Sequence, residues 1–154
     1  MIYAFLLRYY QGTLAIMHPP LYNAGLTAMK RLEDWSVGND SKMREALTYW
    51  STVYTNVSAI VNRCSPLHRD PQSWPDWFDL LVSVGDYKNC WLHVPTLGMQ
   101  LHYPSGTVIA FSGRLLHHGV NEIMGSRYTL TYYMRDNIHA FLTILKACRM
   151  DDFG

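Results

Sequence analysis

Residues 106–135, which read GTVIAFSGRLLHHGVNEIMGSRYTLTYYMR, carry the clearest pattern of secondary structure in the chain. The pattern consists of short runs of aliphatic, β-branched and aromatic residues that are separated by turn residues such as glycine and serine. The runs cover residues 107–111, a segment that ends in His117-His118, and residues 127–133. Short apolar runs between turn residues are typical of antiparallel strands.

The sequence before this stretch contains further strand-like runs, and the two ends of the chain show helical spacing instead. Further strands are expected over residues 51–61, 78–84, 91–94 and 99–103, with a turn at Gly85-Asp86. Apolar residues at helical spacing instead predict helices over residues 2–10, 21–35, 41–47 (with Ser41 as N-cap) and 137–150. Helices, then about eight short strands, then a helix favour a mainly β, α+β fold: a double-stranded β-helix (jelly-roll, cupin-like) barrel with N-terminal helices and a C-terminal helix.

The length and composition are those of one globular domain. Its 154 residues are 49% hydrophobic and 16% charged, which is a composition that can bury a core. We expect a helical N-terminal layer (1–50), a jelly-roll core (51–136) and the C-terminal helix (137–150) within a single domain, 1–154. The net charge of +1 does not indicate a strongly basic body, so nucleic-acid binding would need a local basic patch.

The cysteines and the N-terminus indicate the cellular setting. Cys64, Cys90 and Cys148 are scattered and lack CxxC spacing, which favours a reducing, intracellular location. Arg8 and Gln11 interrupt the apolar N-terminal segment, so it is too short to span a bilayer and lacks the features of a secretory signal. We expect a core-packing helix there and no membrane partner, although a piece of a longer protein could also begin in this way.

Two histidines and one aspartate are candidate metal ligands. His68 and Asp70 are two residues apart, so in an extended chain both side chains lie on the same face. His118 comes from the strand segment farther along the chain. Two imidazoles and one carboxylate form the facial triad of non-haem Fe(II) oxygenases, which leaves three of the six iron positions open. Considered alone, the HRD tripeptide favours a surface loop of solvated charges, and the late histidine is what favours a metal site.

A candidate carboxylate-binding pair follows the histidines. Arg127 and Thr129 are two residues apart on one predicted strand, so they share a face of it. The guanidinium fork of arginine binds a carboxylate bidentately, and a neighbouring hydroxyl can contact the same group. Thr129 could also be an ordinary strand threonine.

The combined pattern HxD…HxV…GxRxT resembles the Fe(II)/2-oxoglutarate-dependent dioxygenases. The text from Asn62 to His139 is similar to the fungal, transposon-associated oxygenases of the TET/JBP class, which oxidise 5-methylcytosine in DNA. The resemblance implies that His68, Asp70 and His118 hold Fe(II) and that Arg127 binds the distal carboxylate of the co-substrate 2-oxoglutarate. It implies O2 as the oxidant, DNA carrying 5-methylcytosine as the partner, a hydroxymethyl product and a nuclear location.

The choice between the adjacent histidines depends on this resemblance. Neighbouring residues on a strand face opposite ways, so only one of His117 and His118 can point inward. Val120 completes the HxV pattern with His118, so we expect His118 to be the ligand and His117 to face outward or to pack elsewhere.

Three further residues are candidates for substrate contact, each with a simpler alternative. Asn62 could contact the oxo acid or the substrate, or it could make a strand-end hydrogen bond. Arg69 could meet a phosphate or be solvated, and Trp74 could stack on a base or cover the barrel mouth. Two other functions stay open: a 2-oxoglutarate-dependent hydroxylase of a protein or small molecule, and a non-catalytic, degenerate barrel that serves as a binding module.

Overall fold

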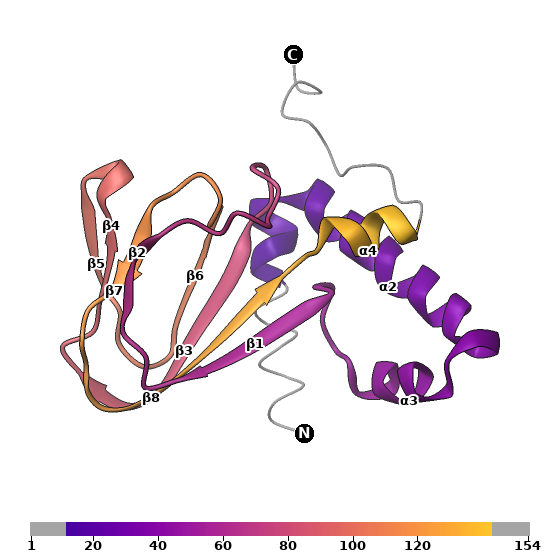
Figure 1. Cartoon of the computed structure of the whole chain (residues 1–154), viewed down its shortest axis with the longest axis horizontal. Coiled ribbons are helices and arrows are strands. Elements are labelled where there is room, and N and C mark those ends of the chain that lie inside the picture. Colours follow the sequence, from indigo (N-terminus) through magenta and orange to yellow (C-terminus); the bar gives the residue numbers. More distant parts are fainter. Residues whose placement is uncertain (1–11, 143–154) are drawn as a thin grey trace, which may run out of the picture. The chain divides into compact units, whose positions relative to one another are not determined.

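The structure is a computed structural model that describes residues 12–142. Contacts between Cα atoms divide the chain into two compact units. One unit is Asn56–Tyr133, which contains the strands, and the other comprises Met1–Thr55 together with Met134–Gly154 (Figure 1).

The strand unit consists of two four-stranded antiparallel sheets. One sheet has the strand order β1-β8-β3-β6 and the other has the order β2-β7-β4-β5 (Figure 1). The eight strands are β1 (Asn56–Val61), β2 (Ser65–His68), β3 (Asp79–Lys88), β4 (Trp91–Val94), β5 (Met99–His102), β6 (Thr107–Phe111), β7 (His118–Val120) and β8 (Met124–Tyr133), and a short 3-10 helix, η1 (Pro95–Leu97), joins β4 to β5. Except for β4 and β5, which pair with each other in one sheet, successive strands alternate between the sheets in a jelly-roll-like arrangement, which confirms the predicted α+β fold class.

The core of this unit lies between the two sheets. Its buried residues come from β3 and β6 of the first sheet, from β4 and β7 of the second, and from the positions just before β4 and just after β5: they are Tyr87, Cys90, Leu92, Val94, Tyr103, Phe111 and Val120. Burial of apolar side chains from both sheets is the main force that holds such layers together.

Two predicted strand boundaries are wrong, and tertiary contacts explain both. The strand predicted over 51–61 begins only at Asn56, because Val53 and Tyr54 are buried in the helical unit instead. The turn predicted at Gly85-Asp86 does not occur, since β3 continues through both residues and pairs with β8 there. Gly85 has a φ of +136°, and a Cβ atom on it would collide with the Ser126 carbonyl oxygen, so this glycine permits close strand pairing.

The helical unit contains α2 (Pro19–Asn39), α3 (Ser41–Tyr49) and α4 (Asp136–Phe141). The helix α2 begins earlier than predicted because His18 is its N-cap: the Nδ1 atom accepts a hydrogen bond of 3.2 Å from the Leu21 amide. Asp40, and not Ser41 as predicted, caps α3, since its carboxylate accepts from the amides of Lys42 and Met43 at 3.0 Å each.

The helices predicted at the two ends of the chain lie partly or wholly outside the described residues. The helix expected over residues 2–10 lies wholly outside them, and so does most of the helix expected over 137–150, of which α4 covers the start. None of the helices within residues 12–142 is long and apolar enough to cross a membrane.

Candidate metal centre

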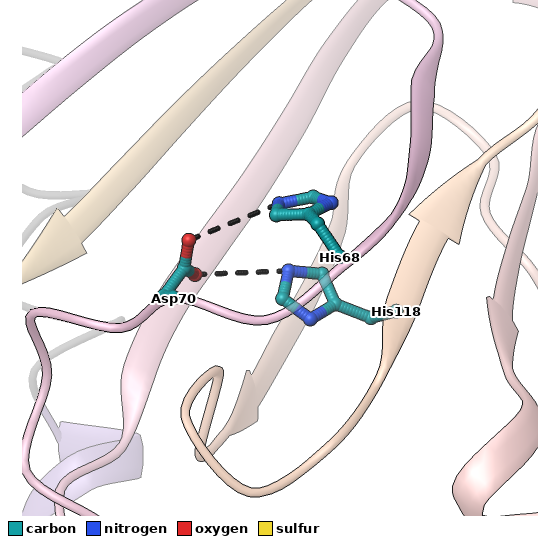
Figure 2. A group of neighbouring side chains, drawn as sticks. All are labelled: His68, Asp70 and His118. Carbon is teal, nitrogen blue, oxygen red and sulfur yellow. Dashed lines mark ion pairs between the residues drawn. The ribbon is translucent and has the colours of Figure 1, made fainter.

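Strand pairing brings the two histidines together. β2 and β7 are antiparallel neighbours, and their register places His68 directly opposite His118. Asp70 follows β2 by two residues and returns its carboxylate toward both imidazoles (Figure 2). The three side chains, called the metal cluster below, thus come from a strand end, a loop and a strand start.

The distances within the metal cluster fit a shared ion. The Asp70 carboxylate oxygens lie 3.8 Å from the His68 Nε2 atom and 3.7 Å from the His118 Nε2 atom (Figure 2). The two ring centroids are 4.3 Å apart. One potential ligand atom from each residue lies within 4.8 Å of the other two. Atoms that all bind one ion at about 2.0–2.2 Å must be closer than about 4.4 Å to one another, so small side-chain rotations would suffice.

Backbone carbonyl groups orient both imidazoles in the same way. The Nδ1 atom of His68 lies 2.8 Å from the Pro66 carbonyl oxygen, and the Nδ1 atom of His118 lies 3.0 Å from the Leu116 carbonyl oxygen. A carbonyl oxygen can only accept, so this geometry assigns the proton to Nδ1 in each neutral ring. The Nε2 lone pairs are then directed toward Asp70, which is the tautomer that a metal ligand requires.

Burial differs between the two sides of the metal cluster. The side chain of His118 is only 8% exposed, whereas that of Asp70 is 44% exposed. Burial lowers the pKa of His118, and the nearby His68 lowers it further, against the Leu116 carbonyl and the Asp70 carboxylate, which raise it. His118 therefore favours the neutral, metal-binding form, while the exposed side leaves an approach for a substrate.

A glycine permits this position of Asp70. The backbone amide of Asp70 donates a 2.9 Å hydrogen bond to the Gly113 carbonyl oxygen. A Cβ atom on Gly113 would lie 2.5 Å from one carboxylate oxygen of Asp70 and 2.8 Å from one of Asp79. Any larger residue at position 113 would displace a carboxylate of the metal cluster.

Arg127 lies inside the barrel core without an anionic partner. It is 4% exposed, and its Nε atom donates a 2.8 Å hydrogen bond to the Ser83 hydroxyl. Its Cζ atom is 4.9 Å from the ring centroid of Tyr103 and 5.9 Å from that of Tyr87. Among residues 12–142, no carboxylate forms an ion pair with this guanidinium.

A chain of hydroxyl groups holds the guanidinium in place. The Tyr87 hydroxyl donates to the Tyr103 carbonyl oxygen at 3.0 Å and lies 2.7 Å from the Ser83 hydroxyl. Since Tyr87 uses its proton on that carbonyl, Ser83 donates to Tyr87 and accepts from Arg127. Each of these groups has a defined donor or acceptor role, so hydrogen bonds within the core fix the orientation of the Arg127 side chain.

Two buried hydroxyl groups beside Arg127 have no hydrogen-bond partner in the described structure. They are Thr129 Oγ1, which shares the inward face of β8 with Arg127, and the Tyr103 hydroxyl. Tyr103 is fully buried, and burial raises its pKa to about 12 against the lowering effects of the Arg127 charge and of the Arg127 side chain acting on its oxygen. Together with Arg127, these two residues form the arginine cluster (Arg127, Thr129 and Tyr103). An unpaired buried cation with two unpaired donors is suited to a carboxylate.

The inner face of β3 connects the two clusters. Asp79, at the start of the strand, lies next to Gly113 at the metal cluster. Leu81 packs on the core, and Ser83 contacts Arg127. These alternate residues share one face of the strand and span roughly 13 Å at the usual strand rise. A ligand between the sheets can therefore contact both clusters.

The other residues proposed from the sequence lie outside the metal cluster. Asn62 is exposed, and its Oδ1 atom accepts a 2.7 Å hydrogen bond from the Arg127 amide while its own amide donates to the Arg127 carbonyl oxygen at 2.9 Å. Arg69 is exposed and Trp74 is partly buried, both in the segment between β2 and β3. His117 is also exposed, and its amide donates to the Thr96 hydroxyl.

Sequence reasoning did not find Gly113, Ser83 or Tyr103. No spacing pattern distinguishes them, because each matters only through a partner that is distant in the sequence. The apolar run over residues 107–111 indicated the strand beside them, but the unpaired hydroxyl of Tyr103 becomes visible only when both sheets are assembled.

A comparison with protein families agrees with this geometry. A family model, Tet_JBP, which describes the oxygenase domain of the 2OGFeDO superfamily, matches residues 4–136. No curated protein matches the chain. Members of this superfamily are oxidoreductases that use Fe(II) and 2-oxoglutarate, and the metal cluster provides a possible site for the iron. The chain therefore belongs to the Tet_JBP oxygenase family of the 2-oxoglutarate- and Fe(II)-dependent dioxygenases.

Proposed function

We propose that this protein hydroxylates the methyl group of 5-methylcytosine in DNA, with Fe(II) held by His68, Asp70 and His118 and with 2-oxoglutarate held by Arg127 and Thr129. The observation that carries the proposal is the combination of a three-ligand metal cluster with an unpaired, buried arginine inside the same barrel.

The composition of the metal cluster supports iron. Two neutral imidazoles and one carboxylate are the ligands of non-haem Fe(II) oxygenases and leave positions for other molecules. When iron and 2-oxoglutarate are bound, they supply the oxidation: O2, 2-oxoglutarate and the methyl group become succinate, CO2 and a hydroxymethyl group. The protein's own contribution is the orientation of both imidazoles by the Pro66 and Leu116 carbonyl groups.

The arginine cluster supports a dicarboxylate co-substrate. A buried guanidinium without a counterion costs several kcal/mol of stability, and a buried hydroxyl without a partner costs about 1–3 kcal/mol. A carboxylate placed between Arg127 and Thr129 would satisfy both groups at once. The Ser83 hydrogen bond leaves the terminal guanidinium nitrogens available for it, and the inner face of β3 leads from there to the metal cluster.

Exposed residues around the metal cluster support a nucleic-acid substrate. Arg69 separates the two ligands His68 and Asp70, and Arg114 follows Gly113; both arginines are exposed. Arg114 also donates a hydrogen bond to the Pro71 carbonyl oxygen, so it is held on the Asp70 loop. Arginines at this mouth can bind phosphates of a flipped-out nucleotide, and Trp74 in the same loop can stack on a base. A DNA substrate would place the protein in the nucleus.

The test is an incubation of the protein with Fe(II), 2-oxoglutarate, O2 and a DNA duplex that contains 5-methylcytosine. Mass spectrometry of the digested DNA should detect 5-hydroxymethylcytosine, with succinate formed in equal amount. A duplex with unmodified cytosine is the matched control and should give neither product above background.

Two other outcomes would indicate a different function for the protein. Succinate that is formed without oxidised cytosine would reject the DNA substrate and favour a hydroxylase of a protein or small molecule. If a folded, metal-loaded protein made neither product nor bound 2-oxoglutarate, the enzyme proposal would be rejected in favour of a non-catalytic binding module.

A further inference from the structure

Tyr103 occupies an unusual place in the arginine cluster. It directly follows β5, is fully buried and lies with its ring 4.9 Å from the Arg127 Cζ atom. Its carbonyl oxygen accepts from Tyr87, and its amide donates to the Cys90 carbonyl oxygen at 2.9 Å. The backbone is thus fully engaged, and the ring packs in the core between the sheets.

The hydroxyl proton of Tyr103, in contrast, has no acceptor in the described structure. The Arg127 side chain interacts with the Tyr103 hydroxyl oxygen, and the neighbouring Tyr87 hydroxyl makes two hydrogen bonds. A phenylalanine would fill the core equally well, because the ring alone provides the packing and the contact with Arg127. A buried polar atom without a partner destabilises the fold, and such atoms need an explanation such as a missing ligand.

The Tyr103 hydroxyl is also chemically ready to act as a donor. Burial keeps it protonated, with the pKa raised to about 12. It cannot donate to the guanidinium, which has no acceptor. The partner that it lacks is therefore an acceptor, and the positive charge of Arg127 favours an anionic one.

We propose that Tyr103 is a binding residue for the co-substrate, which donates a hydrogen bond to the same distal carboxylate that Arg127 binds. This inference rests on the proposed function, because it assigns a role within the proposed 2-oxoglutarate site. Three groups then meet one carboxylate: the guanidinium, the Thr129 hydroxyl and the Tyr103 hydroxyl. The site selects ligands that carry a second carboxylate far from the metal-binding end.

The proposal has an unusual consequence for Tyr103→Phe. In the ligand-free protein the substitution removes an unpaired buried hydroxyl, so the variant should melt at the same temperature as the wild type or higher. In the complex it removes a hydrogen bond to a charged group, so binding of 2-oxoglutarate should weaken about 10-fold, within the range for such bonds. A purely structural tyrosine would give the opposite sign for stability and no change in binding.

The experiment measures 2-oxoglutarate binding calorimetrically, with Mn(II) in place of iron so that no turnover occurs. Wild type, Tyr103→Phe and Tyr128→Phe are compared. Tyr128 is the matched control, because it lies between Arg127 and Thr129 in the sequence but is 49% exposed. We expect Tyr128→Phe to bind like the wild type. Pyruvate, which lacks the distal carboxylate, should bind with the same affinity to wild type and Tyr103→Phe.

Three other results would reject either the role of Tyr103 or the proposed function. Equal binding of 2-oxoglutarate by wild type and Tyr103→Phe would overturn this inference and leave the proposed function intact. An equal loss of pyruvate binding in Tyr103→Phe would also overturn it, because the effect would then lie at the metal end. A Mn(II)-loaded wild type that bound no 2-oxoglutarate would reject the proposed function itself.

Discussion

At the scale of single residues, Asp70 differs from the other two members of the metal cluster. It is the one carboxylate of the metal cluster, and it contacts both histidines. Its position depends on the absence of a side chain at Gly113. The histidines have carbonyl groups that orient them, so loss of Asp70 should remove the negative charge without disturbing the rings.

We therefore expect Asp70→Ala to weaken Fe(II) binding by on the order of 100-fold or more, since even supporting residues of a metal site contribute about 10- to 100-fold. Succinate formation should fall to background. Anaerobic titration with Fe(II) measures the first effect and a succinate assay the second. Asp86→Ala, which removes an exposed carboxylate from β3, is the control. Unchanged 2-oxoglutarate turnover in Asp70→Ala would exclude this metal cluster.

Arg127 permits an equally specific test, because lysine keeps the charge but lacks the guanidinium fork. Arg127→Lys should also lose the Nε hydrogen bond to Ser83. A charge-assisted hydrogen bond contributes roughly 1.5–3 kcal/mol, so the KM for 2-oxoglutarate should rise about 10- to 150-fold. Steady-state kinetics check this, with Arg63→Lys, an exposed arginine, as control. An unchanged KM would show that another group holds the distal carboxylate.

At the scale of secondary-structure elements, the spacing of β2 and β7 determines whether the histidines can share an ion. Gly119, next to His118, allows the strands to approach: a Cβ atom there would lie 2.8 Å from the Ser65 carbonyl oxygen and 3.1 Å from the Leu67 amide nitrogen. The backbone of β2 would have to shift to accept any side chain at this position.

Gly119→Val should therefore weaken metal binding although every ligand is still present. The added side chain would separate His68 from His118, whose ring centroids are now 4.3 Å apart. The same anaerobic Fe(II) titration tests this prediction, and Gly38→Ala is the control, because a Cβ atom at Gly38 in α2 meets nothing within 4 Å. If Gly119→Val bound Fe(II) as tightly as the wild type, close pairing of β2 and β7 would be unnecessary for the site.

The strands also show which parts of the fold could be predicted from the sequence. The strands predicted over 91–94 and 107–111 have those bounds in the structure, because short apolar runs between turn residues are a local signal. The extent of β3 was not predictable in this way, since Gly85 resembles a turn residue unless its partner strand β8 is known. The metal cluster was inferred from residue type and spacing, with His118 chosen over His117 through the family resemblance, whereas the role of Tyr103 depends on a missing partner in three dimensions.

At the scale of the whole molecule, two buried histidines make the stability of the metal-free protein sensitive to acid. Burial is the largest effect that lowers the pKa of His118 and of His139 from the usual 6.5. A histidine with a lowered pKa in the folded state binds a proton more readily after unfolding. The unfolded state then binds more protons, so the free energy of unfolding rises with pH in this range.

The free energy of unfolding should thus be fully retained above pH 6.5, the usual histidine pKa, and should decrease as the pH falls below it. Urea titrations of the metal-free protein at several pH values between about 7.5 and 5 measure the slope. His139→Gln should reduce the slope because one of the two groups is removed, and His102→Gln, at an exposed position, is the comparison variant. Saturating Zn(II), which binds neutral imidazole, should raise the free energy of unfolding most at high pH and less as protons compete for His118. A free energy of unfolding that increased toward pH 5 would contradict the assignment of both histidines as neutral in the folded protein.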